Sequence, residues 1–209
     1  MFFSFIRFIG TTFLRIINGA PRVLNKERLP EGNYILVAPH RAWFDMVYLS
    51  WAATPKQFCY MAKKELFKNP LLRWLITHLN AFPVDRSKPG IKAIKTPVKW
   101  LKERDISLIM FPSGTRHSQK LKGGVLLIAK MANVPIVPAV YQGPLTFRDI
   151  LKRHKSTIAF GNPITVGQGR LSKDKQALIL EQMNTAFQQL DNQIDPNYVY
   201  QDPTKTKKQ

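Results

Sequence analysis

A histidine and an aspartate, His40 and Asp45, are the residues of this chain best suited to proton-transfer chemistry. They follow an apolar run, Tyr34–Ala38, that has the composition of a buried strand. Loops that leave buried strands often carry catalytic groups, because the scaffold holds them rigidly. A turn between the two residues would let the carboxylate bind one imidazole nitrogen and leave the other free as a base. Since such pairs also occur by chance, the pair alone suggests catalysis without establishing it.

A second polar segment, Phe111–Arg116, follows another apolar run and reads FPSGTR. Gly114 gives access to backbone N–H groups, Ser113 and Thr115 supply hydroxyls, and Arg116 supplies a guanidinium. These donors together suit a phosphate group. The segment therefore predicts a phosphate-binding loop, with a surface ion pair as the alternative for the arginine.

The elements that would position these loops alternate along the chain. The expected strands are Asn33–Ala38, Gln57–Ala62, Ser107–Phe111, Ile136–Tyr141 and Thr157–Gly161. The expected helices are Phe44–Ala53, Leu71–His78, Ile91–Arg104, Gly123–Asn133 and Ser172–Asp191. This alternation indicates a single α/β domain with a central mixed, largely parallel sheet flanked by helices. Ligands bind beyond the carboxyl ends of the strands in such sheets.

Pro135 directly precedes the fourth expected strand, and Pro138 lies within it. Proline cannot donate a hydrogen bond to a neighbouring strand, so it is usually confined to edge strands and strand starts. The sequence therefore predicts that this strand lies at an edge of the sheet or begins irregularly.

Residues 1–19 are rich in Phe and Ile, but Arg7 and Arg15 interrupt them. The uncharged stretches are too short for a membrane span or a signal peptide. On a helix the polar side chains would form one stripe: Ser4, Arg7, Thr11, Arg15, Asn18 and Arg22. The apolar side chains would cover the remaining surface. This pattern favours an amphipathic helix lying in the membrane interface, with packing on the protein's own core as the alternative.

The chain is strongly basic: its 209 residues include 32 Lys and Arg but only 13 Asp and Glu, a formal net charge of +19. Such a surface attracts nucleic acid, anionic membrane or acidic carriers. Basic runs occur at 152–155 and 205–208. Neither a zinc-finger spacing nor an aromatic RNA-binding strand motif is present, so an anionic membrane is favoured and no nucleic acid is expected.

The remaining reactive side chains predict no further chemistry. The single cysteine, Cys59, excludes an internal disulfide and is expected to be a small core residue of a cytoplasmic protein. His78, His117 and His154 are isolated in the sequence. A metal site needs three or four converging ligands, so no metal is predicted.

Four segments, in order and spacing, resemble the motifs of the 1-acylglycerol-3-phosphate acyltransferases, the PlsC type of glycerolipid acyltransferase. The H-x4-D motif is matched by His40 and Asp45, and the aromatic residue with a D-R pair by Phe82, Asp85 and Arg86. The F-P-E-G-T-R motif is matched by Phe111–Arg116, where Ser113 replaces the usual Glu, and V-P-I-V-P by Val134–Pro138. The resemblance covers about residues 33–163.

The resemblance implies an enzyme of phospholipid biosynthesis that moves a fatty acyl group from an acyl thioester to the sn-2 hydroxyl of 1-acyl-sn-glycerol-3-phosphate, giving phosphatidic acid. His40 would be the base, and Asp45 would orient it and stabilise the imidazolium. Arg86, Arg116 and the loop residues Ser113, Gly114 and Thr115 would bind the acceptor. No cofactor is implied, because acyl-CoA or acyl carrier protein serves as the co-substrate.

Two classes of alternative stay open. One is a different acceptor, such as glycerol-3-phosphate or another lysophospholipid, because the family's missing Glu is thought to help hold the acceptor. The other is a non-catalytic basic protein that binds membrane or nucleic acid on the same fold, against which the intact His40 and Asp45 argue.

The expected organisation follows from these observations. Residues 1–30 would form an amphipathic membrane-associating segment, 31–195 the acyltransferase domain, and 196–209 a basic, disordered tail. The expected partners are an anionic membrane surface, lysophosphatidic acid, and acyl-CoA or acyl carrier protein. The expected location is peripheral, on the cytoplasmic face of the cell membrane.

Overall fold

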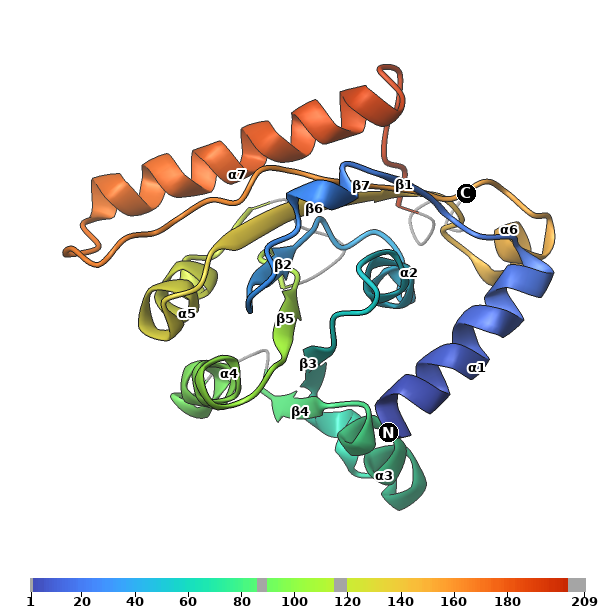
Figure 1. Ribbon diagram of the computed structural model, residues 1–209, viewed down its shortest axis with the longest axis horizontal. Helices are drawn as coiled ribbons and strands as arrows, with labels where there is room; N and C mark the ends of the chain where they lie inside the picture. Colours follow the sequence, from blue (N-terminus) through green and yellow to red (C-terminus); the bar gives the residue numbers. More distant parts are fainter. Residues whose placement is uncertain (1, 86–89, 115–119, 203–209) are drawn as a thin grey trace.

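A mixed β-sheet organises the computed structural model, which describes residues 2–85, 90–114 and 120–202. Within these residues the sheet has seven strands in the order β1-β7-β6-β2-β5-β3-β4 (Figure 1). The strands are β1 (Arg22–Leu24), β2 (Ile35–Val37), β3 (Phe58–Lys63), β4 (Ala81–Val84), β5 (Ser107–Met110), β6 (Ile136–Gln142) and β7 (Thr157–Phe160). The β6–β7 pair is antiparallel and the other pairs are parallel. The predicted mixed, largely parallel sheet is confirmed.

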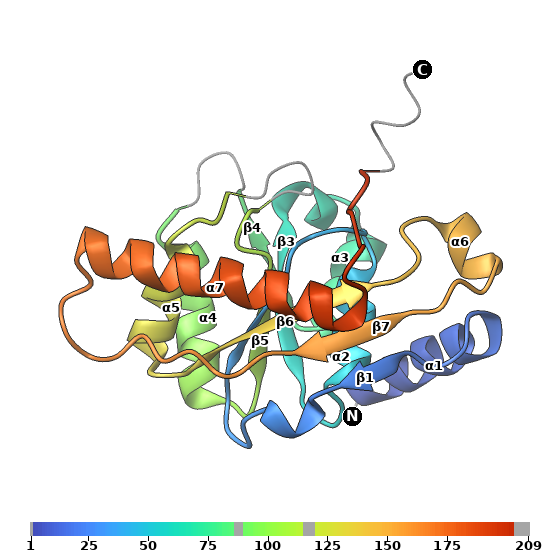
Figure 2. The same ribbon diagram turned by 90° about the horizontal axis from the view of Figure 1, so that it is seen from above.

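Helices cover both faces of this sheet (Figures 1 and 2). They are α1 (Phe2–Ile17), α2 (Asp45–Ala52), α3 (Pro70–His78), α4 (Lys92–Glu103), α5 (Gly124–Ala132), α6 (Phe147–Leu151) and α7 (Lys173–Ile194), with short 3-10 turns at Lys26–Arg28 and Lys64–Phe67. All six expected helices, α1 included, are present within a few residues of their expected bounds. None of the helices in the described part of the chain has the length and apolar content of a membrane span.

Alternate side chains of the strands point to two separate apolar cores, as the pleat of a β-strand requires. In β2, Ile35 and Val37 join the core under α4, α5 and α7, whereas Leu36 joins the core under α2. Cys59 lies fully buried in the first core, where burial raises the pKa of its thiol to about 12. The expectation of a structural cysteine is confirmed.

The edge position considered for β6 is wrong, because this strand lies inside the sheet between β2 and β7 and is buried along its whole length, but the irregular start that was the other expectation is present. The prolines fit because regular pairing with β7 starts only at Ala139, opposite Phe160. The carbonyl of Pro138 accepts a 2.7 Å hydrogen bond from the N–H of Gly161, the residue that directly follows β7. The missing N–H therefore falls at a natural break in the ladder, which resumes at an isolated bridge between Ile136 and Ile164.

Three short elements were not expected from the sequence: β1, β4 and α6. The strands have three and four residues, and β4 contains Pro83. The helix has only five residues. Segments of this length carry too few residues for hydrophobic periodicity to identify them.

Candidate active site

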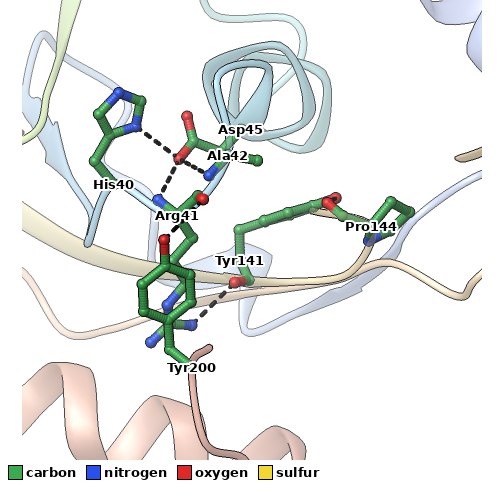
Figure 3. Close-up of polar contacts among 7 residues, drawn as sticks. All are labelled: His40, Arg41, Ala42, Asp45, Tyr141, Pro144 and Tyr200. Carbon is green, nitrogen blue, oxygen red and sulfur yellow. Dashed lines mark hydrogen bonds and ion pairs between the residues drawn. The ribbon is translucent and has the colours of Figure 1, made fainter. Parts of the chain in front are cut away.

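The loop between β2 and α2 holds His40 and Asp45 in direct contact (Figure 3). Imidazole Nδ1 lies 3.0 Å from carboxylate Oδ2, and the same oxygen accepts hydrogen bonds from the N–H groups of Arg41 (2.9 Å) and Ala42 (3.2 Å). Asp45 is the first residue of α2, where the helix dipole favours a negative charge. The side chains of His40 and Asp45 are 9% and 0% exposed. The contact predicted from their spacing is therefore present.

This geometry determines which nitrogen of His40 is available. An ionised carboxylate can only accept hydrogen bonds, so Nδ1 carries the proton that joins it to Asp45. In the neutral ring Nε2 is then the basic nitrogen. It points away from the carboxylate (Figure 3), and no hydrogen bond to it is present among the described residues. The arrangement suits a general base.

The ring of His40 is also fixed by stacking on Phe111, with ring centroids 4.2 Å apart and planes 19° apart. Strands β2 and β5 are parallel neighbours, and Val37 is paired with Met110. Both loops therefore begin side by side at the carboxyl ends of these two strands. This is why two segments about seventy residues apart in the sequence form one site.

The second polar segment turns tightly after β5. Gly114 has a φ of +74°, in the left-handed region, and its N–H donates to the carbonyl of Phe111 at 2.9 Å. The N–H of Lys122 donates to the carbonyl of Pro112 at 3.0 Å, so the chain returns to the start of the segment. Ser113 is buried and lines the same cavity as His40. Of the other predicted substrate-binding residues, Arg86, Thr115 and Arg116 lie outside the described residues.

Lys122 is a cation that the sequence reasoning did not select as a ligand. Its Nζ would lie 3.3 Å from a Cβ atom built on Gly114, so its ammonium reaches the turn of the loop. The available signal was its position in the segment Leu121–Gly124, shortly after the FPSGTR segment. A positive charge at this turn adds to the phosphate-binding character of the loop.

Arg41, inside the H-x4-D segment, anchors the loop to α7. Its buried guanidinium donates to both carboxylate oxygens of Asp191, one at 2.8 Å, and to the carbonyl of Tyr141 at 3.0 Å. The amide of Gln142 donates to the same carboxylate at 2.8 Å. Because this network joins residues 150 positions apart, no local spacing could reveal it.

Residues 196–202 cross the same region, although the sequence predicted a disordered tail from residue 196. The ring centroid of Tyr198 lies 4.9 Å from the guanidinium of Arg41, and the Tyr200 hydroxyl donates to the Arg41 carbonyl at 3.1 Å (Figure 3). The tyrosines give this polar segment aromatic surface that packs on a buried cation. Residues 203–209 lie outside the described residues.

A cavity of about 550 Å³ opens beside His40. The β2 loop, the β5 loop, α7 and residues 198–200 form its walls, and α7 contributes polar side chains: Glu181, Asn184, Gln188 and Asp191. The cavity lies beyond the carboxyl ends of β2 and β5, as the sheet topology predicted. Within the described residues, no three His, Cys, Asp or Glu side chains are grouped as metal ligands would be.

Helix α1 turns part of its polar stripe toward the rest of the protein, with Arg7 and Asn18 at least partly buried. Arg7 donates to the carbonyls of Lys56 (2.8 Å) and Pro55 (3.3 Å), and the stripe lines a groove of about 480 Å³. The exposed side chains of α1 include large apolar ones: Phe5, Phe8, Ile9, Phe13 and Ile16. Phe3 is buried and Leu14 and Ile17 pack against the core under α2, so part of the apolar surface anchors α1 and the five exposed side chains remain available for a membrane.

Comparison with known proteins gives concordant results. A family model described as Acyltransferase matches residues 20–142. The 1-acyl-sn-glycerol-3-phosphate acyltransferase of Streptococcus pneumoniae is 45% identical, over 92% of this chain and 74% of that protein. The protein of the same name from Bacillus subtilis is 40% identical, over 86% of this chain and 92% of that protein. Among solved structures, the 1-acyl-sn-glycerophosphate (LPA) acyltransferase PlsC from Thermotoga maritima shares the fold, with a TM-score of 0.68, 22% identity, and coverage of 92% of this chain and 80% of that one.

Proposed function

This chain belongs to the acyltransferase family, and we propose that it transfers a fatty acyl group from an acyl thioester to the sn-2 hydroxyl of 1-acyl-sn-glycerol-3-phosphate, giving phosphatidic acid. The names of relatives 40–45% identical over most of both chains support this acceptor. The observation that carries the chemistry is the 3.0 Å contact of His40 with Asp45 beside an open cavity.

The proposed reaction needs one base and no enzyme nucleophile. The acceptor hydroxyl attacks the thioester carbonyl while Nε2 of His40 takes its proton. Asp45 holds the imidazolium that forms. The tetrahedral intermediate then collapses, the C–S bond breaks, and the departing sulfur takes the proton from His40. One ester and one thiol replace one alcohol and one thioester. A positioned base of this kind contributes about 10²–10⁴ in rate.

The loop after β5 is the proposed site of the acceptor's phosphate. Lys122 supplies a cation at the turn, and Ser113 supplies a hydroxyl within the cavity of His40. The roles of Arg86, Arg116, Gly114 and Thr115 rest on their match to the family's motifs. Two or more cations around the phosphate would place the free hydroxyl of the acceptor for attack.

The proposed donor is acyl-CoA or acyl carrier protein, and no cofactor is needed. Both donors are acidic, and the formal charge of +19 favours association with either. We place the enzyme peripherally at an anionic membrane surface, on the cytoplasmic face, because its acceptor and product are lipids. The outward Phe and Ile side chains of α1 support this placement.

The experiment that tests this function combines purified protein with both donors and a panel of acceptors, with products identified by mass spectrometry. We expect 1-acyl-sn-glycerol-3-phosphate to be acylated, and the activity to be lost in His40→Ala. Preference for glycerol-3-phosphate or another lysophospholipid would reassign the acceptor. This alternative matters most, because Ser113 replaces the Glu of the family's motif. Transfer to none of the acceptors would contradict the catalytic proposal.

A further inference from the structure

We propose that α6 and the turn after it, residues 147–155, form a second contact with an anionic lipid bilayer. Through Trp43 this contact would bring the loop between β2 and α2, residues 38–45, to the membrane surface; we call this the catalytic loop. The contact is inferred from this surface itself, whereas its purpose, access to a membrane-embedded acceptor, rests on the proposed function. We call residues 147–155 the α6 segment.

The apolar part of the α6 segment is exposed although the helix also has a buried side. Phe147 and Leu151 are 59% and 69% exposed and lie four residues apart, so they share one face of the helix. Ile150, on another face, is buried in the core under α2. The exposed pair is therefore additional apolar surface on a helix already anchored in the fold.

This apolar surface continues into the catalytic loop. Trp43 lies between His40 and Asp45 in the sequence and is about half exposed. Its indole contacts the ring of Phe147 edge to face, with centroids 5.0 Å apart. A membrane contact at Phe147 would therefore reach a residue only three positions from the proposed base.

The charged part of the α6 segment favours an anionic partner. Its cationic side chains are all exposed: Arg148, Lys152, Arg153 and Lys155. The single acid, Asp149, accepts hydrogen bonds from the Thr146 hydroxyl (2.7 Å) and the Thr146 N–H (3.0 Å). The segment thus combines four basic residues with exposed apolar side chains, a composition that suits the headgroup region of an anionic membrane.

Hydrogen bonds join the α6 segment to the C-terminal end of α1. Arg153 donates to the carbonyls of Ile16 (2.9 Å) and Ile17 (3.1 Å), and the amide of Asn18 donates to the carbonyl of His154 at 2.9 Å. In both views α6 lies near the C-terminal end of α1 (Figures 1 and 2). The backbone of the exposed Ile16 is therefore bonded to the α6 segment, and both helices carry exposed apolar side chains. Exposed apolar side chains on two bonded helices favour a bilayer over an acidic protein as the occupant.

The test measures binding to vesicles of phosphatidylcholine, with and without phosphatidylglycerol, by co-sedimentation. Phe147→Ser with Leu151→Ser should weaken binding to anionic vesicles about tenfold. Lys152→Gln with Lys155→Gln should weaken binding to anionic vesicles about tenfold and leave binding to neutral vesicles unchanged. Because all four side chains are exposed, thermal unfolding should stay close to wild type and serves as the folding check.

Matched controls come from the other side of the molecule. Leu178, in α7, is 69% exposed, the same fraction as Leu151. Lys95 and Lys102 are exposed on α4. The start of α7 and all of α4 lie far from α6 in both views. Leu178→Ser and Lys95→Gln with Lys102→Gln should leave vesicle binding at the wild-type value.

The outcomes separate this inference from the proposed function. With a short-chain acceptor dispersed as monomers, both α6 variants should keep wild-type turnover, whereas turnover on vesicle-embedded acceptor should fall. Vesicle binding by both variants equal to wild type would overturn the inference. So would unchanged vesicle binding together with a raised KM for acyl carrier protein in the lysine variant, since the segment would then dock the donor. A wild-type protein that binds vesicles through this segment without acyl transfer would contradict only the proposed function.

Discussion

The catalytic loop and the surface formed by α1 and α6 differ in how their side chains are partnered. In the loop, buried charges have partners within the chain: Asp45 holds His40, and Asp191 holds Arg41. On the surface of α1 and α6, large apolar side chains remain in contact with solvent. Internal pairing keeps a reactive group in one geometry, whereas unpaired apolar surface indicates that the partner is outside the chain. The two regions should therefore fail in different ways when mutated, one in chemistry or stability and the other in membrane binding.

The largest expected effect is on the chemistry of the loop. His40→Ala should lower turnover by at least about 10²-fold, because it removes the proposed base. Thermal unfolding and vesicle binding should remain at wild-type values. The control is His78→Ala, which removes an exposed histidine of α3 and should retain activity. Near-normal turnover in His40→Ala would remove the base from the mechanism.

The next effect concerns the stability of the loop. Arg41→Gln leaves the mostly buried carboxylate of Asp191 without its charged partner, a loss of about 3 kcal/mol. Calorimetry should show a fall in Tm of roughly 6–12 °C for a chain of this size. Arg41→Lys should recover part of it, since it keeps the charge without the two-pronged geometry. A Tm unchanged in Arg41→Gln would mean that the loop does not depend on α7.

A smaller effect should appear only at the membrane. Phe5 and Phe13, both 60% exposed on α1, lose apolar surface in Phe5→Ser with Phe13→Ser. Incomplete burial of two such rings is worth about 2 kcal/mol, or roughly thirtyfold in vesicle partitioning. These substitutions spare Asn18, whose side chain accepts from the Tyr48 hydroxyl and would be lost in a truncation of residues 1–19. Equal co-sedimentation with wild type would place the membrane contact elsewhere.

The smallest effect should come from residues 196–202. Tyr200→Phe removes the hydroxyl that donates to the Arg41 carbonyl, a hydrogen bond worth about 1 kcal/mol. We expect a fall in Tm of roughly 2–4 °C without loss of vesicle binding. The adjacent Val199 is 75% exposed, so Val199→Ala is the matched control and should leave Tm unchanged. Equal Tm values for the two variants would mean that this segment does not stabilise the loop.

Local pattern was sufficient for most of the fold and for the centre of the site. Apolar runs located five strands, and the spacing of His40 and Asp45 indicated their contact. The sequence could not reveal the link from Arg41 to Asp191, because it depends on how α7 crosses the finished sheet. The prolines of β6 wrongly indicated an edge position for a related reason. Whether a missing N–H disrupts a strand depends on where the neighbouring strand ends. The end of β7 at Phe160 cannot be read from the sequence of β6.

The bond between Arg41 and Asp191, together with the Tyr200 contact, also bears on when the protein becomes competent during its synthesis. The ribosome delivers His40 and its loop early, and α7 and Tyr200 emerge more than a hundred residues later. A nascent chain therefore carries His40 for most of translation on a loop that still lacks its contacts with α7 and Tyr200. The exposed Phe and Ile side chains of α1 emerge before any of these contacts can form. We expect attachment to the bilayer to precede completion of the catalytic loop, so that the protein is already at the membrane when the proposed acyl transfer becomes possible.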